Sequence, residues 1–205
     1  MKITNLKFKN GFFDIYTEQG LHCTVSDETA FRLNLKSGME LDNEIAERLC
    51  EMSDFETAKR DGASLLSRSA NTRYTFCAKL KQKGHSSKAA EYAADFFEKN
   101  GFLDDLKYAK AYVSDSVRLK QNGKNKIVCN LMKKGVSRDV IDEALSEAEF
   151  GGALERLAEK ELGKLKDRDR KSVEKVKRRL YAKGFGIGEI ITRQDAATII
   201  YRIAM

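Results

Sequence analysis

The sequence predicts a mainly α-helical protein, built from tandem three-helix repeats in an elongated, curved, right-handed array that follows a small N-terminal β-meander. Helix-favouring residues dominate the 205-residue chain, and proline is absent. A short phrase that ends in Lys-Gly recurs three times, which is typical of a repeat architecture. Near the start, partly alternating apolar residues flank Asn10-Gly11, a type I′ hairpin signal.

The repeat is defined by Gly84, Gly135 and Gly184, which lie 51 and then 49 residues apart. When the three segments are aligned on these glycines, the position four residues earlier is always leucine: Leu80, Leu131 and Leu180. The position eight residues earlier is apolar (Phe76, Ile127 and Val176), and so is the position six residues later (Ala90, Ile141 and Ile190). We expect the leucines to be buried. Each glycine follows a lysine where a helix ends, so we expect all three to adopt φ > 0 and to respond alike to substitution.

The chain is organised around the stretch from Gly101 to Arg118. A helix begins at Asp104 or Asp105, and it carries Tyr108 and Tyr112 on one face. A second helix is expected over residues 124–134 and a third from residue 137 onward, which completes one three-helix unit.

The predicted domains are residues 1–52, a small β-rich region with short helices, and three helical repeats over residues 53–102, 103–151 and 152–205. Within the first region, strands are expected near residues 2–8, 12–16 and 21–25, and a helix over residues 42–52. Ser53 and Glu56 have the spacing of a capping box, so a separate helix is predicted to begin there and to continue to about Arg68.

Charge is distributed unevenly along the chain. Residues 1–62 hold 8 Lys/Arg and 12 Asp/Glu, a net charge of −4. Residues 63–205, which contain most of the repeats, hold the remaining 30 Lys/Arg and 19 Asp/Glu, a net charge of +11. A charge run on a helix is usually a solvated face, but here the charges recur beside the Lys-Gly turns and favour a surface that binds phosphate or protein. The candidate binding residues are Arg73, Lys79, Lys81, Lys83, Lys124, Lys126, Lys133, Lys134, Lys175, Arg178, Arg179 and Lys183.

No pattern indicates catalysis or a cofactor. A Gly-rich phosphate loop with Lys-Ser or Lys-Thr is absent, and the glycines from Gly184 to Gly188 follow a helix rather than a strand. The adjacent Asp104 and Asp105 suit helix capping better than acid/base work. We therefore expect a protein that is not an enzyme and needs no cofactor.

The four cysteines and two histidines share no short ligand spacing: Cys23, Cys50, Cys77 and Cys129; His22 and His85. The sequence therefore predicts free thiols in a reducing cytosol, with no metal site and no disulfide framework. No signal peptide and no apolar run long enough to span a membrane is present, which predicts a cytoplasmic protein without a membrane partner.

The central repeat resembles the RecX family, bacterial regulators of the RecA recombinase. The resemblance lies in the segment from Gly101 to Val113, in the Leu131–Gly135 turn, and in Arg118, Gly123, Ile141, Ala144 and Leu145. It covers residues 64–145 well, although Thr72 replaces the family's serine and Thr75-Phe76 its Glu-Leu pair, and it is looser from residue 153 onward.

The resemblance implies a string of three-helix repeats without a catalytic site. It also implies a monomer that docks on a RecA–DNA filament, contacts single- or double-stranded DNA through phosphates, and modulates RecA. A sequence-independent DNA-binding or scaffold protein without a recombinase partner is the alternative that the residues leave open.

Overall fold

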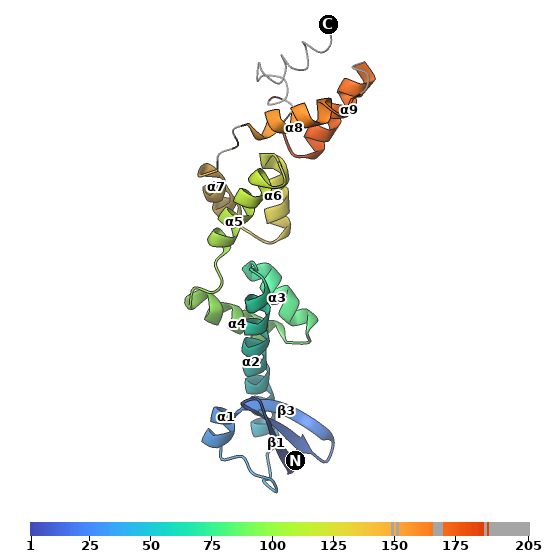
Figure 1. Cartoon of the computed structure of the whole chain (residues 1–205). Coiled ribbons are helices and arrows are strands. Elements are labelled where there is room, and N and C mark those ends of the chain that lie inside the picture. The colour runs from blue at the N-terminus through green and yellow to red at the C-terminus, as the bar shows by residue number, and fades with distance from the viewer. Residues whose placement is uncertain (149, 151, 166–169, 187, 189–205) are drawn as a thin grey trace. The chain divides into compact units, whose positions relative to one another are not determined.

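The computed structural model describes residues 1–148, 150, 152–165, 170–186 and 188 (Figure 1). The chain divides into two compact units, residues 1–104 and residues 105–205, and each is described by itself. In the described part, the chain forms three strands followed by nine helices. The mainly helical fold class is confirmed.

The N-terminal sheet is an antiparallel meander of β1 (Ile3–Lys9), β2 (Phe12–Thr17) and β3 (Gly20–Ser26), in the order β1-β2-β3. Asn10 and Gly11 have φ of 52° and 81°, as the predicted type I′ turn requires. The pairing of β2 with β3 contains one irregularity, because Ile15 pairs with Cys23 whereas Tyr16 pairs with Leu21. His22 is thus an extra, bulged residue of β3.

Two helices follow the sheet, α1 (Asp27–Arg32) and α2 (Asn43–Arg68). The prediction of a helix ending near residue 52 and a new one capped by Ser53 was wrong, since α2 is one helix of 26 residues. Ser53 accepts a hydrogen bond from the N–H of Thr24 and donates to its carbonyl, at 3.0 and 2.6 Å. Glu56 accepts from the hydroxyls of Ser26 and Thr29 at 2.8 and 2.6 Å. Both side chains therefore fasten α2 to the meander, and the expected boundary at residues 52/53 lies inside this helix.

The first three-helix unit combines the second half of α2 with α3 (Arg73–Gln82) and α4 (Ser87–Lys99) (Figure 1). Its core contains Phe76, Leu80 and Phe97 among small alanines of α4. Gly62 of α2 allows the close approach, because a β-carbon there would lie 2.7 Å from Phe76 Cζ and 2.8 Å from Phe97 Cε2. This core is separate from that of the meander, and α2 contributes to both.

The second unit contains α5 (Asp105–Arg118), α6 (Lys124–Lys133), α7 (Arg138–Ser146), α8 (Ala153–Leu162) and α9 (Arg170–Ala182). One continuous apolar core extends from Ala109 to Phe185. The second and third repeats therefore share a core. The third helix expected for the last repeat, with Ile190, falls outside the described residues.

The defining positions of the repeat behave as predicted. Leu80, Leu131 and Leu180 are each 0% exposed. Gly84, Gly135 and Gly184 have φ of 99°, 76° and 91°, the left-handed region that glycine adopts without steric strain. Among the described residues, no helix combines the length and apolarity of a membrane span.

Candidate nucleic-acid interface

In the first repeat, most of the predicted binding residues are engaged within the protein. Arg73 forms ion pairs with Asp95 at 2.5 Å and with Glu98 at 2.7 Å. Lys79 Nζ donates to the side-chain oxygen of Asn71 at 2.5 Å, and Lys83 pairs with Asp61 at 3.0 Å. Lys81 is exposed.

In the second and third repeats, Lys126 and Lys183 connect the two repeats, and Arg179 connects α9 to α8 within the third. Lys126 Nζ donates to the Ala182 carbonyl at 3.3 Å, and Lys183 Nζ donates to the Lys120 carbonyl at 3.0 Å. Arg179 pairs with the buried Glu161 at 2.5 Å. Hydrogen bonds from Lys164 and Arg179 outweigh burial and lower the pKa of Glu161. The side chains that remain exposed in this unit are Lys124, Lys133, Lys175 and Arg178.

The junction between these repeats is built from backbone atoms. Helix α6 begins after Gly123, which has no side chain to cap it. Its N-terminal N–H groups are instead satisfied by the turn after α9. Gly123 N–H donates to the Lys183 carbonyl at 2.8 Å, and Asn125 N–H donates to the Gly184 carbonyl at 3.1 Å. The carbonyl end of one helix thus meets the N–H end of another, a favourable alignment of helix dipoles.

An aromatic and basic surface, which we call the tyrosine face, combines two tyrosines of α5 with a lysine just after α5 and one at the end of α6: Tyr108, Tyr112, Lys120 and Lys134. The two tyrosine rings are stacked, with centroids 6.3 Å apart and planes 14° apart. Lys134 Nζ lies 5.6 Å from the Tyr108 ring centroid, and Lys120 Nζ lies 5.4 Å from that of Tyr112. Lys120 was not among the predicted binding residues. Its position just after the helix, eight residues beyond Tyr112, could have indicated that it lies near the tyrosine rings.

A second cluster of aromatic rings and lysines lies on the first repeat, and no prediction anticipated it. Phe55 of α2 packs on Tyr92 of α4 with ring centroids 4.8 Å apart. Lys59 Nζ lies 4.1 Å from the ring centroid of Phe96, and Lys88 Nζ lies 5.6 Å from that of Phe55. Tyr92 and Phe96 are 48% and 40% exposed, so their rings are accessible to a partner.

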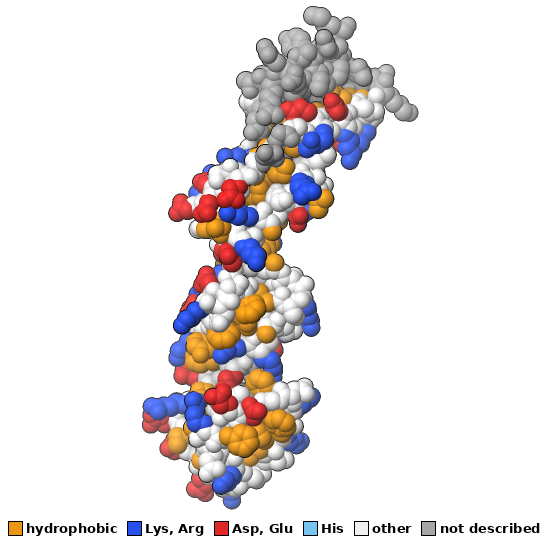
Figure 2. Space-filling model, turned by 60° about the vertical axis from the view of Figure 1, so that its left-hand side comes forward, with side chains coloured by type: hydrophobic (Ala, Val, Ile, Leu, Met, Phe, Trp, Pro, Cys, Tyr) orange, Lys and Arg blue, Asp and Glu red, His pale blue; other side chains and the backbone are white. Residues whose placement is uncertain are grey.

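Figure 2 shows one face of the protein, on which Lys and Arg side chains are interspersed with Asp and Glu rather than gathered in one patch. Because the two signs of charge alternate, this face does not produce one strong positive field. Single lysines and arginines on it can still contact individual phosphates. Aromatic rings beside lysines add a surface on which exposed bases can stack. The groups on this surface can therefore recognise phosphates and bases.

A groove lies between α5 and the end of α7. Its volume is about 360 Å³, and Lys110 and Glu147 form an ion pair of 2.7 Å at its wall. Arg118, one of the residues that carry the family resemblance, also lines it. The groove has mixed polar and apolar walls and is open to a side chain of a partner.

Tandem helical repeats after an N-terminal meander define a class of helical-repeat proteins, and the comparisons with known proteins identify the family. Residues 104–145 match the family model described as RecX, second three-helix domain. A regulatory protein RecX from Clostridium tetani is 33% identical over 150 residues, which cover 72% of this chain and 68% of the relative. One from Clostridium botulinum strain Alaska E43 is 32% identical over 180 residues, covering 84% of each chain. The chain belongs to the RecX family.

Two solved structures have the same fold. A crystal structure of regulatory protein RecX matches with a TM-score of 0.72 at 22% identity, covering 95% of this chain and 98% of that one. The crystal structure of RecX from Lactobacillus salivarius matches with a TM-score of 0.63 at 23% identity, covering 73% and 97%. The sequence relatives are named as regulatory proteins.

Proposed function

We propose that this protein binds the RecA–DNA filament as a monomer in the cytoplasm and modulates RecA, mostly by inhibiting its ATPase and strand exchange. The proposal rests on membership of the RecX family together with one observation, the tyrosine face. No catalytic role is part of the proposal.

The tyrosine face suits a nucleoprotein surface because it offers two kinds of contact side by side, lysine ammonium groups and tyrosine rings. The lysine ammonium groups can neutralise phosphates or acidic side chains of the recombinase. The stacked rings of Tyr108 and Tyr112 can receive unstacked bases or apolar side chains. The exposed residues Lys133, Lys175 and Arg178 extend the basic contact along the same unit.

The repeats supply the means of inhibition. Units that share a core hold their binding groups at fixed spacing, so several weak contacts act together along a partner with regular repeats. A protein bound in this way blocks the rearrangements that RecA needs for ATP turnover and strand exchange.

The test measures RecA ATPase and strand exchange on single-stranded DNA, with and without this protein at a low molar ratio to RecA. We expect a loss of both activities. Replacing Tyr112 with Leu should weaken the inhibition, whereas Tyr112→Phe should retain it, because Phe keeps the aromatic face and only the hydroxyl is lost. Circular dichroism verifies that both variants fold.

The alternative, a sequence-independent DNA-binding or scaffold protein, predicts a different result. Such a protein binds naked DNA with a steep salt dependence, and it reduces RecA activity only when it covers most of the DNA. Unchanged RecA activity at low molar ratio, together with DNA binding, would favour this alternative.

A further inference from the structure

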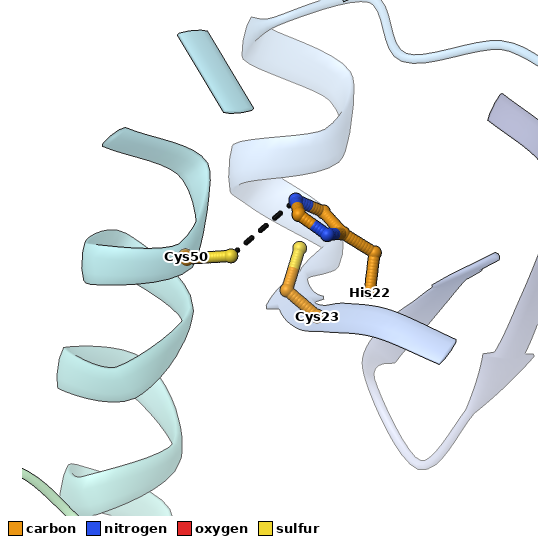
Figure 3. A group of neighbouring side chains, drawn as sticks. All are labelled: His22, Cys23 and Cys50. Carbon is orange, nitrogen blue, oxygen red and sulfur yellow. Dashed lines mark hydrogen bonds between the residues drawn. The ribbon is translucent and has the colours of Figure 1, made fainter. Parts of the chain in front are cut away.

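A bulge in β3 and the packing of α2 on the sheet bring together three side chains from two distant segments of the chain: His22, Cys23 and Cys50. In a regular strand, His22 and Cys23 would point to opposite faces of the sheet. Because His22 is the bulged residue, its side chain turns to the same side as that of Cys23. Figure 3 shows both directed toward Cys50, which comes from the first half of α2.

The distances are those of a cluster of potential metal ligands. His22 Nε2 lies 3.3 Å from Cys50 Sγ, and one ligand atom from each of the three residues lies within 4.8 Å of the others. With Zn–S bonds of about 2.3 Å and Zn–N bonds of about 2.0 Å, a tetrahedral zinc ion needs ligand separations of roughly 3.5 to 3.8 Å. Small side-chain rotations reach that geometry from the one observed.

An open pocket and a local excess of negative charge adjoin the cluster. The pocket, of about 590 Å³, is lined by His22, Cys50 and Glu47 among others. Glu47 precedes Cys50 by three residues on α2, so its carboxylate lies on the same side of the helix. Residues 1–62 carry a net charge of −4, which attracts cations to this end of the chain.

We propose that His22, Cys23 and Cys50 bind a zinc ion, with the fourth position taken by water or by the carboxylate of Glu47. Two thiolates neutralise the ion, and imidazole and sulfur are ligands that zinc prefers. Binding releases the two thiol protons to solvent. The ion then joins β3 to α2 beside the hydrogen bonds of Ser53, as a structural clamp with one accessible position. This proposal replaces the expectation of no metal site, which rested on ligand spacing along the chain.

The proposal rests on the geometry of the three side chains, and the protonation of the Cys23 thiol is consistent with it. Burial raises the pKa of the Cys23 thiol to about 12, so without metal this thiol is neutral at physiological pH. A metal ion must therefore displace its proton, which makes the affinity for zinc rise with pH.

The test uses the full-length protein without a histidine tag, kept reduced and stripped of metal with a chelator. Titration with Co²⁺ should give one equivalent bound, with thiolate-to-cobalt charge-transfer absorption and the visible bands of a tetrahedral ion, both abolished by added Zn²⁺. Zinc should also raise the melting temperature. In Cys50→Ser and in His22→Gln, zinc affinity should fall by roughly tenfold or more.

Controls within the same chain are Cys77→Ser and Cys129→Ser, which should bind zinc like the parent. Cys50 and His22 are only half-buried, so their variants are expected to fold, and circular dichroism verifies this for each. Absence of the charge-transfer band in the reduced parent overturns the proposal. It is equally overturned if Cys50→Ser and His22→Gln both bind zinc like the parent, or if mass spectrometry finds a Cys23–Cys50 disulfide under thiol reductant that excludes metal.

Discussion

The carbonyl oxygen of Gly184 accepts a hydrogen bond from the N–H of Asn125 at 3.1 Å, which links the last described turn of the chain to the start of α6. A β-carbon at Gly184 would collide with the backbone of Lys126, and one at Gly123 would lie 2.5 Å from the Gly184 carbonyl atoms. Each repeat contributes one of these glycines, so the junction between the repeats requires both.

This relationship corrects the expectation that Gly84 and Gly184 respond alike to substitution. Both have φ > 0, but a β-carbon at Gly84 would meet nothing within 4 Å. Gly84→Ala should cost roughly 1 kcal/mol of backbone strain. Gly184→Ala should cost about 2 kcal/mol more, because it adds a clash in a packed junction. Urea unfolding at constant m-value measures both, and equal losses would contradict the junction.

Leu131 is completely buried in the core shared by the second and third repeats. Leu131→Ala should lower the free energy of unfolding by about 2 to 5 kcal/mol, through lost burial and the cavity left behind. The adjacent Met132 is 55% exposed, so Met132→Ala serves as the matched control and should cost far less. Denaturant titration of the two variants would refute the packing if their losses were similar.

The contact of Asp54 with the turn before α4 predicts a dependence of stability on pH. Burial alone would raise the pKa of Asp54, but hydrogen bonds from Ser86 and His85 outweigh it and lower the pKa. His85 Nδ1 lies 2.8 Å from the carboxylate. A carboxyl group with a lowered folded-state pKa stabilises the protein above its unfolded-state pKa, and this contribution disappears as pH falls through the folded-state value.

Asp54→Asn tests that sign. At neutral pH the variant should melt at a lower temperature than the parent. The difference should shrink as the pH falls below about 3.9, the ordinary pKa of aspartate, and approach zero in stronger acid. Scanning calorimetry across this range decides the matter, since a difference independent of pH would mean that charge plays no part. The same measurement on Asp95→Asn shows how the loss of a more exposed carboxylate, on α4, compares with the loss of Asp54.

Charge reversal tests the binding surface. Replacing Lys133 and Lys134 with Glu should weaken binding to RecA on single-stranded DNA and reduce inhibition of its ATPase, since phosphate or acidic contacts are lost. The pair Lys175→Glu and Arg178→Glu should act additively with it. Arg179 is unsuitable for this purpose because its reversal would place a second carboxylate beside Glu161.

A matched control for charge reversal is the pair Lys36→Glu and Lys99→Glu, which changes the net charge equally at exposed positions outside the candidate surface. Folding is monitored by circular dichroism and binding by fluorescence anisotropy at physiological salt. If the folded Lys133 and Lys134 variant inhibits as well as the control, those lysines only solvate the surface.

Local signals predicted the elements of the fold because they depend on residues close in sequence. Asn10-Gly11 set the first hairpin, and the glycines after Leu80 and Leu131 marked helix ends. The false helix boundary at Ser53 has a physical reason as well. A serine followed by a glutamate can cap a helix, but here their oxygens find partners on β3 and α1, and the helix continues.

The candidate site was less predictable because it depends on contacts between distant segments. Nothing local indicates that Lys126 and Lys183 bind backbone carbonyls across the junction, or that Arg179 meets Glu161. For the same reason, Cys23 and Cys50 looked unrelated in the sequence, because only the packing of α2 on β3 places them side by side.

Helix α2, about 39 Å long at 1.5 Å per residue, has its first half in the core of the meander and its second half in that of the first repeat. Trimming the chain at residue 53 would leave the first repeat with a helix whose N-terminal N–H groups have lost their intrahelical partners, and with Glu56 facing water in place of α1. We therefore expect the smallest stable fragment that contains this repeat to include the sheet, and residues 1–104 to unfold as one cooperative unit.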